Sequence, residues 1–157
     1  MNSEEMRDKA MDLFKKRLHW SQAILAVGQE KTGEIDETTV KAMGAFGGGI
    51  VSSGNVCGIL IGAIATISSM YSRGNLDEKE DPRTWSVSSK YLKRFEELTA
   101  PFGSMNCCDI AKVDWKNKLE VKNYYVNPLS TRKICIKLVG DAAYALGELI
   151  EQQSDKD

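Results

Sequence analysis

The sequence has one histidine, three prolines and no Cys-x-x-Cys pair. With His19 as the single imidazole, cysteine–histidine catalysis would have to use that residue or work without an imidazole base. A local zinc ribbon or thioredoxin-type motif is a poor explanation, because both need closely spaced sulfurs. Any site shared by the four cysteines must be assembled by the fold from distant segments. These cysteines are Cys57, Cys107, Cys108 and Cys135.

An excess of one charge is also lacking. The 21 basic and 22 acidic side chains nearly cancel, and no lysine or arginine run is long enough to follow a phosphate backbone. We therefore expect no nucleic-acid partner. Residues 1–17 are charged and amphipathic, without the apolar region and cleavage site of a secretory signal. We expect a reducing, cytoplasmic location, where cysteines are mainly thiols, metal ligands or transient redox partners.

One long segment, residues 42–72, carries no charge at all. Glycines and polar residues interrupt it, and the dense apolar run covers only Val56 to Ile67. This run is too short for the roughly 20 residues that cross a bilayer. The segment predicts a helix at about 55–71 that is buried on all sides in a soluble protein, with no membrane partner.

The rest of the chain is typical of a helical protein. Its 157 residues, 42% of them hydrophobic, suit one domain over 1–157. Helical periodicity, caps and breakers predict an all-α, compact bundle of about five to seven helices around the buried glycine-rich central helix. Other helices are expected after the N-caps Ser3, Asp36 and Ser88, from Ser21 to near Gly33, and from Thr131 to about Glu151, with a short turn capped by Asn106. We expect a mobile polar loop at about 72–86, a short strand or irregular loop at 115–129, and a disordered tail at about 152–157.

Cys57 follows a Ser-Ser-Gly-Asn segment and should occupy the first turn of the central helix. Free N–H groups and the helix dipole there favour an anion such as a thiolate, which would lower the pKa of Cys57. The alternative is that Cys57 is a small buried core residue, a common fate for cysteine. Gly58 and Gly62 leave one face of this helix bare, so a second backbone can approach closely.

The other cysteines are less clearly functional from their surroundings. A disulfide between Cys107 and Cys108 would be strained, because adjacent Cα atoms lie about 3.8 Å apart and disulfides usually span roughly 4.4 to 6.8 Å. We expect one of the two to point toward Cys57 or Cys135 and the other away. Cys135 lies between isoleucines on the last helix, where a core role is the more common one.

Ordered segments from about Phe14 to Leu149 resemble a family of small redox-active proteins named for a C...CGAxxG...C...C signature. The central motif is similar to Cys-Gly-Ile-Leu-Ile-Gly-Ala at 57–63, with Ile59 where alanine is usual. The remaining matching segments are WSQAILA at 20–26, AFGGG at 45–49, FGSMNC at 102–107, and CIKLV at 135–139 followed by DAA at 141–143. The resemblance carries over Cys57, Cys107 and Cys135, leaves Cys108 as an extra, and marks Trp20, Gly47, Gly48, Gly58 and Gly62 as supporting the motif.

The resemblance implies a helical cytoplasmic protein with a thiol/disulfide or electron-transfer role, and it names neither substrate nor redox partner. Cys57 would be the activated thiol, with Cys107 or Cys135 as resolving partner and no cofactor required. The family's first cysteine falls at Trp20, whose indole cannot act as a thiol. A family member with tryptophan at this position has either lost activity or uses Cys108 instead. Whether Trp20 replaces a cysteine or a selenocysteine stays open.

Two alternatives stay open beside this reading. The first is a metal or iron–sulfur module with Cys57, Cys107, Cys108 and Cys135 as ligands. The second is a non-redox helical interaction module whose cysteines belong to the core. A homodimer is a further expectation, since the glycine-rich helix can pack against a partner subunit as readily as within its own domain.

Overall fold

The computed structural model describes residues 1–154, and this range is all-α, as predicted. These residues form eight α-helices and two 3₁₀ turns joined by loops, one α-helix more than the upper end of the predicted range. The helices are α1 (Ser3–Lys15), α2 (Trp20–Thr32), α3 (Glu37–Ala42), α4 (Gly58–Tyr71), α5 (Arg83–Thr99), α6 (Cys107–Ala111), α7 (Lys118–Val126) and α8 (Arg132–Ser154); the 3₁₀ turns are Gly44–Phe46 and Ala100–Phe102.

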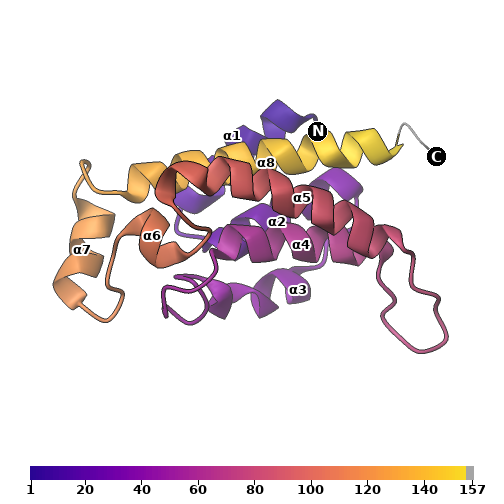
Figure 1. Cartoon of the computed structure of the whole chain (residues 1–157), viewed down its shortest axis with the longest axis horizontal. Coiled ribbons are helices and arrows are strands. Elements are labelled where there is room, and N and C mark those ends of the chain that lie inside the picture. The colour runs from indigo at the N-terminus through magenta and orange to yellow at the C-terminus, as the bar shows by residue number, and fades with distance from the viewer. Residues whose placement is uncertain (155–157) are drawn as a thin grey trace.

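The long helices run side by side, as Figure 1 shows: α8 lies along α1, while α2 and α4 fill the middle of the bundle. The predicted central helix is α4, which packs against α2, α5 and α8. Its residues Ile59, Ala63 and Ile67 are fully buried in the hydrophobic core. The short helices α6 and α7 lie together at one end of the bundle. None of the described helices combines the length and the apolar character needed to cross a membrane.

The bare face of α4 is used as expected. A Cβ atom at Gly62 would lie 2.3 Å from the carbonyl oxygen of Ser21, on the first turn of α2. A Cβ atom at Gly58 would lie 2.8 Å from the carbonyl oxygen of Phe46. Real Cβ atoms do not approach oxygen so closely, so both glycines are required for the contact between α4 and the segment 21–46. This contact places the start of α2 beside the start of α4.

The helix boundaries differ from the prediction at several places. Asn2 caps α1 in a capping box with Glu5, so the cap lies one residue before the predicted Ser3. Helix α5 begins at Arg83, five residues before Ser88, because Pro82 presets φ and the Asp81 carboxylate accepts the Arg83 N–H at 2.8 Å. The polar loop is therefore residues 72–82.

The expectation of a strand or irregular loop at 115–129 is wrong. Asn117 caps α7 by accepting the N–H groups of Leu119 and Glu120. This cap outweighs the β propensity of the Tyr124-Tyr125-Val126 segment. At the C-terminus, residues 152–154 continue α8, which contradicts the predicted disorder there, and 155–157 lie outside the described residues.

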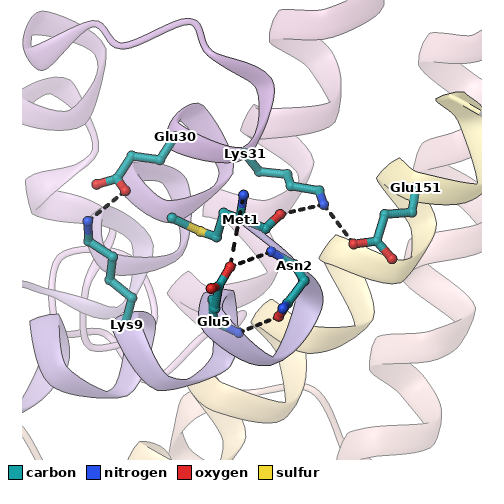
Figure 2. A network of polar contacts seen from close by, with 7 residues as sticks. All are labelled: Met1, Asn2, Glu5, Lys9, Glu30, Lys31 and Glu151. Carbon is teal, nitrogen blue, oxygen red and sulfur yellow. Dashed lines mark hydrogen bonds and ion pairs between the residues drawn. The ribbon is translucent and has the colours of Figure 1, made fainter.

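A polar network joins α1, α2 and α8 at the end of the bundle that holds both termini (Figure 2). The Lys31 ammonium lies 2.7 Å from Glu151 and 2.7 Å from the carbonyl oxygen of Met1, and it is only 13% exposed. Lys9 pairs with Glu30 at 2.6 Å. Cys135 is on the first turn of α8, about 24 Å along the helix from Glu151. The network therefore fixes one end of the bundle, and the cysteines lie at the other.

Candidate functional site

Cys57 and Cys107 are brought together by a short antiparallel pairing. Val56 and Asn106 form an isolated bridge, flanked by hydrogen bonds from Cys57 N to Met105 O (3.0 Å) and from Cys107 N to Asn55 O (2.7 Å). Because side chains alternate along extended backbone, both cysteines project to the same face of this pairing. They are diagonal neighbours, whose Cα atoms lie about 7 to 8 Å apart in such ladders. This separation is slightly larger than the usual disulfide span.

The glycine-rich loop packs directly over this pairing. Residues 48–52 have consecutive positive φ values of 51° to 72°, a left-handed turn that includes Ile50 and Val51. Such a conformation is unfavourable for β-branched residues. Hydrogen bonds from Gly54 N to Gly48 O and from Asn55 N to Gly49 O, both 3.0 Å, close the turn. A Cβ atom at Gly49 would lie 2.7 Å from Cys107 Cβ, so the loop needs glycine to cover the cysteine.

Cys135 joins the same cluster from the first turn of α8. Cys135 lies close enough to Cys57 and Cys107 for a negative charge on its sulfur to raise the pKa of both. The Tyr124 hydroxyl faces Cys135 but lies outside normal hydrogen-bond geometry. Both this hydroxyl and the Trp20 indole act to lower the pKa of Cys135, because they favour its thiolate form. Thus three of the four cysteines, from three separate segments, lie near one another at one end of the bundle.

Aromatic rings cover the sulfur atoms. The Trp115 Nε1–H donates to Cys107 Sγ at 3.3 Å, and the Trp115 ring contacts the rings of Trp20 and Tyr124 at centroid distances of 5.4 and 5.0 Å. Trp20 also packs against Phe14 at 5.2 Å and is buried. The only histidine, His19, is exposed, and its ring lies against Trp20. The cluster is thus enclosed by indole and phenol groups.

Burial controls the ionisation of these thiols. Desolvation raises the pKa of Cys57 far above its ordinary value, although the N–H groups of Ile59 and Leu60 act in the opposite direction. The pKa of Cys135 is raised for the same main reason. The predicted lowering of the Cys57 pKa is therefore wrong: Cys57 is the N-cap of α4, but it is only 5% exposed, and the cost of burying a charge exceeds the effect of the helix terminus.

The pKa of Cys107 is less perturbed than that of Cys57. Burial raises its pKa to about 11, while the hydrogen bond from Trp115 lowers it. At neutral pH all three thiols are protonated, and a thiolate on one would further disfavour a thiolate on another. The cluster is therefore unreactive at rest, because the thiolate is the nucleophilic form.

The raised pKa of Cys107 predicts a loss of stability at alkaline pH. Below pH 9, its ordinary pKa, the thiol is protonated in both states; between pH 9 and about 11 only the unfolded state loses the proton. The free energy of unfolding should fall by about 1.4 kcal/mol per pH unit in this range for this one group. We expect denaturant titrations at several pH values to show that the free energy of unfolding of Cys107→Ala falls less steeply with pH than that of wild type, by that amount per pH unit. An unchanged pH dependence of the free energy of unfolding in Cys107→Ala would contradict the assignment.

Cys108 points away from the cluster and is exposed, which confirms that the two adjacent cysteines have opposite orientations. Across residues 1–154, no group of three or more histidine, cysteine, aspartate or glutamate side chains is placed to hold a metal ion. The four cysteines together thus do not form the ligand set considered from the sequence.

The fold and the site define an all-α protein with a buried cluster of thiols and aromatic rings. The model of the family described as "Putative redox-active protein (C_GCAxxG_C_C)" matches residues 18–149, most of the chain, and the chain belongs to this family. No curated protein and no solved structure gives a match.

Two residues of the site were missed by the sequence analysis. Trp115 and Tyr124 lie in the segment whose structure was least clear from the sequence, yet they contact Cys107 and face Cys135. Their only sequence signal is a pair of aromatic residues carrying hydrogen-bond donors in a polar segment that follows a cysteine. The site residues assigned by resemblance, Cys57, Cys107 and Cys135, converge in the structure, and Trp20 lies among them.

Proposed function

We propose that this protein is a thiol redox protein that cycles between a form with three buried thiols and a form with one disulfide among them. The observation that carries the proposal is the convergence of Cys57, Cys107 and Cys135 in a chain of this family. Forming the disulfide releases two electrons and two protons, which reduce a two-electron acceptor such as a partner disulfide to two thiols.

The geometry favours Cys57 and Cys107 as the pair. They project from the same face of one backbone pairing, and a small backbone movement brings diagonal neighbours within disulfide range. Cys107 is the better attacking thiol, because its pKa of about 11 leaves it more easily ionised than Cys57. Cys57 then acts as the resolving thiol, which reverses the roles expected from the sequence.

The high pKa values imply that the reaction is gated. A buried, protonated thiol exchanges slowly, so the glycine-rich loop over Cys107 must move before a partner disulfide can reach the sulfur. Its strained left-handed residues Ile50 and Val51 are exposed, which places the strain at the surface of the same loop. We assign the cluster a regulated electron-carrying role rather than rapid turnover.

The proposal is tested by counting thiols in reduced and oxidised protein. Both samples are acid-quenched, denatured, alkylated and weighed intact, with metal content measured on the same material. We expect oxidation to remove two alkylation sites reversibly, mapping to Cys57 and Cys107. Cys57→Ser and Cys107→Ser should abolish that loss, whereas Cys108→Ser should keep it. Four alkylated thiols after oxidation would overturn the proposal and favour a structural role.

A further inference from the structure

The exposed cysteine that the proposed disulfide does not use lies in a cavity of its own. This cavity has a volume of about 520 Å³, within the range of small-ligand sites. Cys108 shares its lining with the hydroxyl-bearing Ser52 and Ser53, the ring of Trp115, and two lysines, Lys112 and Lys116. Cys108 therefore shares a concave surface with cationic, hydroxyl and aromatic groups, which an isolated surface thiol does not.

The cavity is attractive to anions. Among the described residues, neither Lys112 nor Lys116 forms an ion pair, so both ammonium groups are available to a ligand. Asp114 is the only acidic side chain in the lining, which leaves an excess of one positive charge. The lining carries both signs of charge, and its net positive charge favours anionic solutes over cationic ones. A small carboxylate-bearing molecule therefore suits this cavity.

The cavity is also adjacent to the buried cluster. Trp115 forms part of its wall and donates its indole N–H to Cys107 Sγ at 3.3 Å, so one side chain separates the cavity from the buried thiols. Another part of the wall is the glycine-rich loop, where a Cβ atom at Gly54 would lie 3.1 Å from Cys108 Cβ. A ligand bound here therefore contacts both Trp115 and the glycine-rich loop, the two structures that cover Cys107.

We propose that this cavity binds an anionic low-molecular-weight disulfide and that Cys108 becomes thiolated there. The Cys108 thiolate attacks one sulfur of the disulfide R–S–S–R, forming a Cys108–S–S–R bond as the R–S–S–R bond breaks. The leaving sulfur departs as RS⁻ with the bonding electron pair, and it takes up the proton that Cys108 released to solvent. The bound disulfide is the oxidant, and the buried thiols take no part.

The test compares three disulfides of different charge on the reduced full-length protein: glutathione disulfide (anionic), 2-hydroxyethyl disulfide (neutral) and cystamine (cationic). Acid-quenched samples are weighed and peptide-mapped over time, and each rate is divided by the rate of the same disulfide with a free cysteine peptide. We expect the first adduct on Cys108, with a normalised rate about tenfold higher for glutathione disulfide than for cystamine at low salt, falling in 1 M salt.

Matched lysine variants separate the cavity from general surface charge. Lys112→Gln with Lys116→Gln should remove the preference for the anionic disulfide, whereas Lys118→Gln with Lys122→Gln, on the exposed face of α7, should retain it. Equal normalised rates for the three disulfides, a first adduct elsewhere, or a preference unchanged in the first double variant would each overturn the inference. Cys108→Ser should lose the adduct but keep the reversible loss of two buried thiols, so the two proposals fail separately.

Discussion

Replacing Gly62 with alanine is expected to destabilise the protein by about 3 kcal/mol or more, the upper range for adding a methyl group to a closely packed core. The added Cβ would lie 2.3 Å from the carbonyl oxygen of Ser21 and 2.5 Å from Ile24 Cγ2. The first of these atoms belongs to the backbone of α2, so it cannot yield by a rotamer change. Relief requires α2 to move away from α4, which also displaces Trp20 at the start of α2. Chemical denaturation followed by far-ultraviolet circular dichroism measures the loss of stability.

Gly74→Ala is the matched control. Its added Cβ would have one neighbour, Glu78 Oε2 at 4.0 Å, and its backbone has no positive φ that disfavours alanine. The free energy of unfolding of this variant should stay within about 0.5 kcal/mol of wild type. Equal stability of the two variants would show that α2 and α4 are not held at the separation described. A change in tryptophan fluorescence in Gly62→Ala alone would report the displacement of Trp20.

Much of the fold could be predicted because local signals agreed with the packing. The apolar, uncharged segment around Gly58 and Gly62 identified the central helix, and Gly33 and Asp36 marked helix ends where the structure has them. Helix α7 could not be predicted in the same way. Only Tyr124 among its residues is buried, so the segment has no apolar stripe, and a single Asn117 cap decides its conformation.

The candidate site was accessible from the sequence only in part. Resemblance to the family selected Cys57, Cys107 and Cys135, but helix position alone gave the wrong direction for the pKa of Cys57. A helix N-terminus favours a thiolate by a modest amount, and this effect is overturned when the sulfur is almost fully buried. The surroundings of Cys57 include Tyr91, Cys107 and Cys135, which are distant in the chain, so its burial cannot be seen in the local sequence.

Replacing Trp20 with cysteine should restore a fourth thiol to the cluster and create a second redox pair. Trp20 is buried, and removing most of its side chain should cost about 3 kcal/mol or more in the reduced protein. The new thiol would lie beside Cys135, because the Trp20 indole that it replaces is close enough to lower the pKa of Cys135. Oxidation should then remove two further alkylation sites, at position 20 and at Cys135. Closing a loop of about 115 residues should return about 5 kcal/mol of stability to the oxidised form in the loop-entropy model.

Trp20→Ser isolates the effect of the sulfur from that of the cavity. Both substitutions remove the indole and its ring contacts with Phe14 and Trp115, so both should weaken the reduced protein similarly. Only the cysteine variant should become more stable on oxidation, and only it should lose the two additional alkylation sites. If the oxidised cysteine variant keeps a free thiol at position 20, then residue 20 does not face Cys135 closely enough for a bond. The indole of this chain would in that case be a structural cover, and the family's first cysteine would need a partner other than Cys135.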